Sequence, residues 1–205
     1  MINNYDNLNK SIIEARGNKN SILQSYEIFI DNFNKLNDKY KFSVSFSSDY
    51  IFKQLEEIVN SKPRTLNYIP FGIKDIFNTE VLPTEMGSEI WKGFKAGNNA
   101  RIVDEIIFRG GLSFCKTSTA EFAVDYIEEG HTLNPHNIEH ITGTSSAGSA
   151  VAVACGALPI CLGSQTAGSI IRPASFCGVF GFKPSFGAFD RTGVLKTTDT
   201  LDTIG

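Results

Sequence analysis

Apolar side chains recur with the period of a helix near the start of the chain, within otherwise polar sequence. The pattern predicts an amphipathic helix over about residues 21–36, preceded by a shorter helix. Its apolar members are Ile22, Leu23, Tyr26, Ile28, Phe29, Ile30, Phe33 and Leu36. One face of this helix is therefore expected to pack against a core.

After this helix, the spacing of the apolar residues changes. Residues 42–46 alternate apolar and polar side chains, which predicts a short strand, with an extended connector as the alternative. Asp49 stands where a helix N-cap is expected, ahead of a second helix that reaches about Asn60. We take residues 1–62 as an N-terminal helical region.

After Lys62-Pro63, short apolar runs alternate with turn residues and helical stretches. A glycine pair, Gly110-Gly111, ends one of the helices. The alternation of strands and helices predicts an α/β core over residues 63–205 with a largely buried sheet. Strands are predicted over residues 68–75, 112–116 and 158–162, and helices over residues 100–109 and 149–156.

Composition narrows the class of protein. The chain has 205 residues, of which 41% are hydrophobic and 20% charged, as in a globular protein with one sizeable core. A net charge of -3 gives no basic surface for nucleic acid. The sequence has no run of eighteen apolar residues, and its first six residues lack the pattern of a secretory signal. We expect a cytoplasmic protein that binds neither nucleic acid nor membrane.

The cysteines and histidines favour structural roles over metal binding. None of the cysteines forms a CxxC pair, and we expect four buried free thiols: Cys115, Cys155, Cys161 and Cys177. The histidines cluster without metal-ligand spacing to a carboxylate, so solvated or capping roles are expected, with metal binding as the alternative: His131, His136 and His140.

A segment rich in glycine and hydroxyl side chains covers residues 143–149 and reads Gly-Thr-Ser-Ser-Ala-Gly-Ser. A flexible linker is one interpretation. Against it, a helix of small residues follows directly, and N–H groups at such a loop–helix junction can hold an anion or an oxyanion. Phosphate binding is a rival, although neither a GxxxxGK[ST] motif nor a strand–GxGxxG–helix arrangement is present.

Two more segments carry candidate chemistry. Residues 163–174 place a serine after small residues, where a sharp turn exposes its hydroxyl; a plain β-turn is the alternative. In residues 72–75, Lys74 follows an apolar strand, where desolvation lowers a lysine pKa and makes a neutral base possible. Taken alone, a lysine of this kind more often forms a salt bridge with a nearby acid.

These segments supply serines and a lysine but no well-placed Ser-His-Asp set, because the histidines precede both serine motifs in a polar stretch. A serine nucleophile needs a base to take its proton. Ser-Lys arrangements provide one on several folds.

Together, residues 143–150, 163–169 and 172–184 resemble the signature sequence of the amidase signature family. Residues 72–75 resemble the family's lysine motif, and residues 116–122 and 134–135 are similar to family residues at the corresponding places. The resemblance covers about residue 64 to residue 205. It implies an α/β fold whose mixed sheet is flanked by helices, and an amide-cleaving activity carried by residues 143–184.

The resemblance also implies roles for particular residues. Carried over by motif position, Ser169 is the nucleophile, Ser145 the bridging serine after a cis peptide bond, and Lys74 the base of a Ser-cisSer-Lys triad. The implied reaction cleaves a carboxamide C–N bond through an acyl-enzyme, with no cofactor. The backbone N–H groups implied to hold the oxyanion are those of Thr166, Ala167, Gly168 and Ser169.

Differences from the family pattern indicate which branch of the family the chain resembles. Thr144 and Ala147 stand where the family often has glycine or another small residue. Residues 165–168 read Gln-Thr-Ala-Gly, whereas Asp-Thr-Gly-Gly is common in the transfer-RNA amidotransferase branch. This difference favours a stand-alone amidase acting on a small amide. A glutamine-hydrolysing amidotransferase A-type subunit is the alternative.

Family members are usually more than twice this length, and residues 201–205 have no polar tail. We therefore expect a truncated N-terminal half, with an incomplete sheet because the C-terminal half is absent. The expected partners are a small-molecule amide and either a second copy of the chain or a complementary C-terminal fragment. A non-enzymatic remnant is a further alternative.

Overall fold

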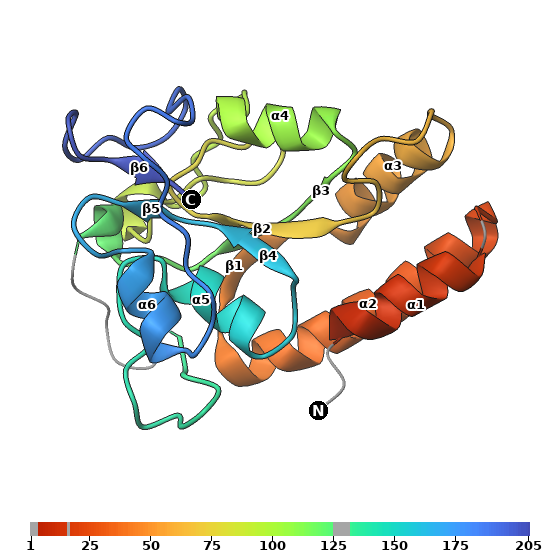
Figure 1. The fold of residues 1–205 in the computed structure, drawn as a ribbon, viewed down its shortest axis with the longest axis horizontal. Helices are drawn as coiled ribbons and strands as arrows, with labels where there is room; N and C mark the ends of the chain where they lie inside the picture. Colours follow the sequence, from red (N-terminus) through yellow and green to blue (C-terminus); the bar gives the residue numbers. More distant parts are fainter. Residues whose placement is uncertain (1–3, 16, 125–131) are drawn as a thin grey trace.

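The computed structural model describes residues 4–15, 17–124 and 132–205. A mixed four-stranded sheet with the order β1-β3-β2-β4 lies at the centre (Figure 1). β3 (Leu112–Thr117) pairs antiparallel with β1 (Ser43–Phe46) and parallel with β2 (Pro70–Lys74), which pairs parallel with β4 (Ile160–Leu162). Every residue of β2 and β3 is buried. The predicted α/β fold with a mixed sheet flanked by helices is confirmed.

Three helices form the N-terminal part: α1 (Asn4–Ala15), α2 (Lys19–Tyr40) and α3 (Ser48–Val59). α2 extends beyond the predicted helix at both ends, because the Asn18 side chain caps its first turn and Lys41 ends it in the left-handed conformation. The expectation that Asp49 caps α3 is wrong. Ser47 is the N-cap, since its hydroxyl accepts a hydrogen bond from the N–H of Tyr50.

Aromatic side chains join these helices to the sheet. Phe33 of α2 contacts Phe114 of β3 edge to face, with ring centroids 4.8 Å apart, and contacts Phe42 in the same manner. β1 comes from the first 62 residues and yet pairs with β3. The division of the chain at residues 62 and 63 stays a prediction.

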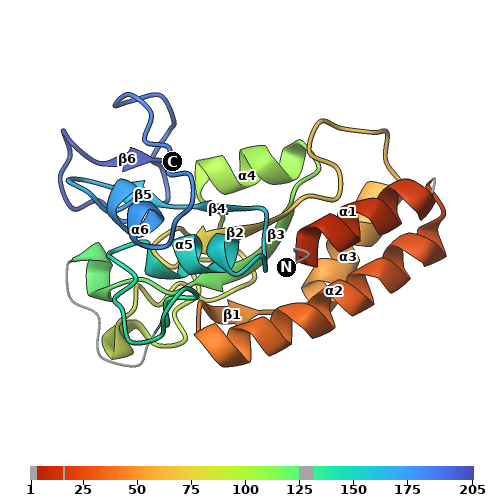
Figure 2. The same cartoon turned by 60° about the horizontal axis from the view of Figure 1, so that its bottom comes forward.

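Helices cover both faces of the sheet. α4 (Arg101–Phe108) and α5 (Ala147–Ala154) lie on opposite faces in both ribbon views (Figures 1 and 2). α5 begins two residues before the predicted helix, at the end of the serine-rich segment. A Cβ at Gly148 would overlap both the Phe42 carbonyl oxygen and the Ser118 nitrogen, so glycine lets this helix approach the backbone of the sheet.

A second, two-stranded sheet pairs β5 (Ser164–Gln165) with β6 (Thr203–Ile204). The loop of residues 166–169 leads from β5 towards α6 (Ile171–Phe176), where the sequence predicted a sharp turn. Two single-turn 3₁₀ helices complete the described elements: η1 (Glu89–Trp91) and η2 (Glu121–Ala123).

The cysteines are free, as expected, but their burial differs from the prediction. Cys115 and Cys177 are buried, whereas Cys155, the C-cap of α5, and Cys161, within β4, are half-buried. Within the described ranges, no helix combines the length and the apolar character needed to cross a membrane.

Candidate active site

Lys74 ends β2 and points to the face of the sheet that α5 covers. Its Nζ donates hydrogen bonds to Ser145 Oγ at 2.7 Å and to Ser164 Oγ at 2.9 Å. The side chain is fully buried. Burial lowers the pKa of Lys74 from 10.5 to about 7, although the negative charge of Asp202 acts in the opposite direction. A lysine in this environment can lose its proton near neutral pH.

Hydrogen bonds to the backbone carbonyls of Thr144 and Ser145 hold Ser145 in place. The Thr144–Ser145 peptide bond is cis, where the family resemblance expected it. The carbonyl of Ser145 accepts hydrogen bonds from Thr119 Oγ1 at 3.0 Å and from the Ala120 N–H at 3.3 Å. The guanidinium of Arg172 donates to the Thr144 carbonyl at 3.0 Å. These contacts fix the hydroxyl of Ser145 against Lys74.

Ser169 lies in the loop between β5 and α6, with its carbonyl 3.2 Å from the N–H of Ser146. Gln165 shapes this loop from within. Its Oε1 accepts hydrogen bonds from the N–H groups of Ile170 and Ile171 at 2.9 and 3.0 Å, and its Nε2 donates to the Ala167 carbonyl at 3.0 Å. One glutamine side chain therefore turns the backbone around Ser169.

The same loop presents free backbone donors. Among the described residues, none offers an acceptor within hydrogen-bond distance of the N–H groups of Ala167, Gly168 and Ser169. Consecutive N–H groups without acceptors are suited to an oxygen that gains negative charge during a reaction. The loop can therefore act as an oxyanion hole.

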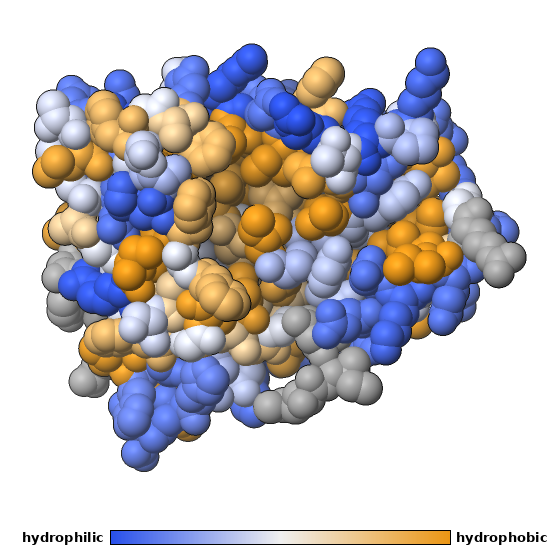
Figure 3. Space-filling model, in the orientation of Figure 1, coloured by the Kyte–Doolittle hydropathy of each residue, from blue (hydrophilic) through white to orange (hydrophobic). Residues whose placement is uncertain are grey.

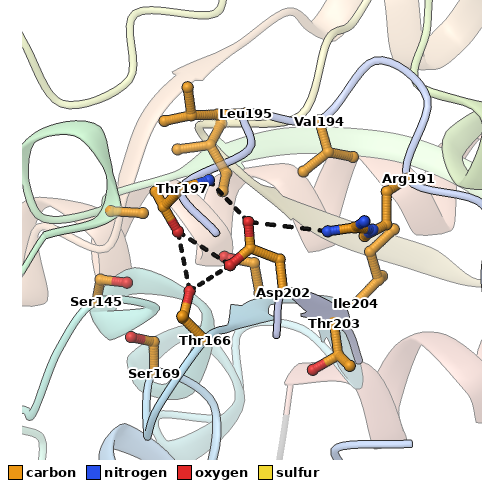
Figure 4. A pocket seen from close by; sticks show the side chains of 13 residues that line it. Ser145, Thr166, Ser169, Arg191, Val194, Leu195, Thr197, Asp202, Thr203 and Ile204 are labelled. Atoms are coloured by element: carbon orange, nitrogen blue, oxygen red, sulfur yellow. Dashed lines mark hydrogen bonds and ion pairs between the residues drawn. The ribbon is translucent and has the colours of Figure 1, made fainter. Parts of the chain in front are cut away.

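Ser145, Ser164, Thr166 and Ser169 line one small pocket (Figure 4). Its cavity volume is about 10 Å³, which is room for roughly one water molecule. Asp202 lies on the same pocket and is joined to Thr166, as the dashed lines in Figure 4 show. Both candidate serines thus face a common space, one of them in contact with a lysine whose pKa is lowered.

The predicted lysine and serines are brought together, and two further residues join them. Ser164 is the second partner of Lys74, and its signal was available, since it lies in the same Gly-Ser-Gln motif as the turn around Ser169. Asp202, which is buried in the structure, carries no pattern in the sequence that sets it apart from the other carboxylates of the chain. The alternative interpretation of Lys74, a salt bridge with a nearby acid, does not hold for the adjacent Asp75, which pairs with Lys116.

The histidines take no part in this pocket as far as the described residues show. His136 Nε2 lies 2.9 Å from the Cys177 carbonyl oxygen, and His140 is exposed. His131 lies outside the described residues. Among those that are described, no group of three His, Cys, Asp or Glu side chains is placed to hold a metal ion.

The family model described as Amidase matches residues 24–205, and the chain belongs to this family. The glutamyl-tRNA(Gln) amidotransferase A subunit of Halothermothrix orenii is 37% identical over 181 residues. The native peptide amidase of Stenotrophomonas maltophilia superposes with a TM-score of 0.82 at 28% identity over 95% of this chain. A vestigial protein complex bearing on the origins of an s-triazine catabolic enzyme superposes with a TM-score of 0.85 at 28% identity, also over 95% of this chain.

The chain spans less than half of the length of each of these relatives. The chain is covered to 86% in the alignment with the Halothermothrix orenii protein, but it spans 37% of that relative's length. It spans 43% of the Stenotrophomonas maltophilia peptide amidase chain and 45% of the chain from the vestigial complex.

Proposed function

We propose that this chain carries the catalytic part of an amidohydrolase that cleaves carboxamide C–N bonds. Neutral Lys74 accepts the hydroxyl proton of Ser145, which in turn accepts the proton of Ser169. The Ser169 oxygen attacks the carbonyl carbon of the amide and forms a tetrahedral intermediate. The observation that carries this proposal is the 2.7 Å contact between Lys74 and Ser145 inside a buried site.

In this mechanism the N–H groups of residues 167–169, which have no acceptor among the described residues, hold the oxygen of the tetrahedral intermediate. Thr166 lies at the start of the same loop. Donors of this kind contribute about 3 kcal/mol to transition-state stabilisation. The relayed proton then moves to the leaving nitrogen, the C–N bond breaks, and an amine or ammonia departs. Water next attacks the carbonyl carbon of the Ser169 ester and gives a proton to the relay. The bond from this carbon to the Ser169 oxygen then breaks, the relay returns the proton to that oxygen, and the carboxylic acid departs.

A fluorophosphonate probe tests this assignment without knowledge of the substrate, because it labels activated serines. We expect wild-type protein to be labelled at Ser169, and Ser169→Ala to lose labelling. Ser175→Ala, which removes an exposed hydroxyl of α6, is the matched control and should be labelled like wild type. Labelling that survives in Ser169→Ala would overturn the assignment of the nucleophile. Ammonia release from a panel of small amides then identifies the acyl group.

A second candidate is an amidotransferase component that releases ammonia from glutamine. It is favoured by the names of the curated relatives, such as the Methanosarcina mazei glutamyl-tRNA(Gln) amidotransferase A subunit, 40% identical over 141 residues. The sequence Gln-Thr-Ala-Gly at residues 165–168, in place of the Asp-Thr-Gly-Gly common in the amidotransferase branch, favours the stand-alone amidase instead. Glutamine hydrolysis that depends on a partner protein and on acylated transfer RNA would favour the amidotransferase.

We also propose that further polypeptide of the kind that completes these relatives covers the outer side of β4. An apolar cavity of about 960 Å³ opens there between α4, α5 and residues 178–182, and Figure 3 shows it as an orange hollow on this face. Ile160 of the edge strand is 55% exposed, and Phe180 and Phe182 are exposed beside it. An unpaired strand edge next to so large an apolar surface is typical of an interface.

Co-expression tests whether such a polypeptide binds to the outer side of β4. The C-terminal part of the Halothermothrix orenii relative should co-purify with this chain in a one-to-one complex, and Ile160→Lys should abolish the complex. Lys92→Glu, on the exposed η1 segment, is the matched surface control. A homodimer that excludes the fragment would identify a second copy as the occupant. A monomer that binds neither and is not labelled at Ser169 would support a non-enzymatic remnant.

The free thiols support a reducing compartment, and we place the protein in the cytoplasm.

A further inference from the structure

Asp202 is a buried carboxylate at the entrance to β6, and both of its oxygens accept hydrogen bonds. Oδ1 accepts from the hydroxyls of Thr166 and Thr197. Oδ2 accepts from the backbone N–H groups of Thr197 and Thr198 at 2.7 and 2.9 Å. One side chain therefore ties a turn of residues 197–202 to the first residue of the loop that leads to Ser169.

Arg191 is a cation close to the Asp202 carboxylate. Arg191 Nη1 lies 3.9 Å from Oδ2, and its Nη2 donates to the Asp199 carbonyl. Burial raises the pKa of Asp202, but the hydrogen bonds from Thr166, Thr197 and Thr198 outweigh it and lower the pKa overall. Asp202 is thus ionised at neutral pH, on the pocket that Ser145, Ser164 and Ser169 line.

We propose that Asp202 is a positioning residue with two linked roles. Its carboxylate fixes Thr166 and with it the loop around Ser169. Its negative charge stabilises the ammonium form of Lys74, whose partners Ser145 and Ser164 line the same pocket as Asp202. This inference rests on the proposed function for its catalytic meaning. The charge effect on Lys74 can be measured whether or not Ser169 is the nucleophile.

Two variants separate the roles. Asp202→Asn removes the charge, and its amide NH₂ cannot accept from the N–H groups of Thr197 and Thr198, so charge and clamp are both weakened. Thr166→Val removes one arm of the clamp and leaves the charge in place. A role confined to structure predicts similar effects of both variants on the loop and no effect of either on the titration of Lys74.

The direct measurement is an NMR titration of the full chain with ¹³C at the lysine ε position, with the Lys74 signal assigned by its loss in Lys74→Met. Asp202→Asn should shift the Lys74 pKa downward, because a favourable charge is lost. Thr166→Val should leave it at the wild-type value. Asp202→Glu should restore it at least in part. An unchanged Lys74 pKa in Asp202→Asn would overturn the proposal.

A parallel measurement follows the rate of fluorophosphonate labelling against pH. In Asp202→Asn the acidic limb of this profile should move to lower pH along with the Lys74 pKa, while the maximal rate falls as in Thr166→Val. Asp202→Ser, which leaves room for water at the two N–H groups, replaces Asp202→Asn if that variant does not fold. If the Lys74 pKa moves while no variant is labelled, the proposed function fails and the electrostatic role of Asp202 is upheld.

Discussion

Lys74 and Lys116 are buried lysines on adjacent parallel strands, and their surroundings differ in kind. Ile73 pairs in register with Lys116, so Lys74, the next residue, points to the opposite face of the sheet. Lys116 Nζ lies 2.8 Å from Asp75 Oδ1 and also donates to Thr84 Oγ1 and the Pro83 carbonyl. The partners of Lys74 are two hydroxyls. One lysine is thus structural by its contacts, and the other is available for proton transfer.

The structural lysine gives the first prediction. Lys116→Met should lower the free energy of unfolding by about 3–5 kcal/mol, because it leaves the buried carboxylate of Asp75 without its cation. Urea denaturation followed by circular dichroism measures the loss. The control is Lys92→Met, which removes an exposed partner of Glu89 and should leave the midpoint unchanged. A Lys116→Met midpoint equal to that of the control would contradict this account.

The stability of the fold should depend on pH through Lys74. Its folded pKa of about 7 lies below the ordinary value of 10.5, so between these pH values the unfolded chain binds more protons than the folded one. Unfolding free energy therefore rises with pH across this window, by on the order of 5 kcal/mol in total for this group. Lys74→Met removes the titration and should be more stable than wild type at neutral pH.

Denaturation curves at several pH values from about 7 to 10 test this, with wild type and Lys74→Met compared at each. The difference between the two proteins should shrink as the pH rises. A difference that stays constant across the window would mean that the folded pKa of Lys74 is near its ordinary value.

The rate at which Ser169 reacts with a fluorophosphonate should depend on the protonation state of Lys74. Because the proposed relay needs the neutral form of Lys74, fluorophosphonate labelling should rise with pH and level off above about 7. Lys74→Arg stays charged throughout and should slow labelling about a hundredfold or more. Lys62→Arg, an exposed lysine outside the site, is the control. A labelling rate independent of pH in wild type would count against Lys74 as the base.

The close approach of α5 to the sheet predicts the effect of a single methyl group. Gly148→Ala places a Cβ against backbone atoms of Phe42 and Ser118, which cannot move aside as a side chain could. The expected cost is about 1–3 kcal/mol or more, measured as a lower thermal midpoint. Ala154→Ser at the other end of α5 is the control and should have a small effect. A Gly148→Ala midpoint matching the control would show that α5 has room to shift.

Much of this fold could be predicted from local pattern, and the failures have physical causes. The α2 stripe and the β2 and β3 strands are long enough for periodicity to identify them. β5 and β6 have two residues each, too few for any pattern, and depend on pairing between positions far apart in the chain. Ser47 caps α3 because its backbone is extended and Asp49 already lies inside the helix, a difference that composition does not report.

The candidate site also contains residues that the sequence indicated and one that it did not. Lys74, Ser145 and Ser169 were found through motifs, and the structure adds the contact that makes Lys74 unusual. Asp202 was missed because its importance comes from hydrogen bonds to residues 166, 197 and 198, which no spacing along the chain reveals. A long-range carboxylate of this kind is visible once the turn that carries it has folded onto β5.

The hydroxyl surroundings of Lys74 have one more consequence. A serine hydroxyl can both donate and accept, so a simple rotation of the O–H bonds of Ser145 and Ser164 suits either protonation state of the amine. Lys116 has no such freedom, because a neutral amine beside the Asp75 carboxylate would forfeit the attraction that holds the pair. The hydrogen-bond partners of Lys74 can therefore serve both its charged and its neutral form without moving a heavy atom, which is what the proposed proton relay requires.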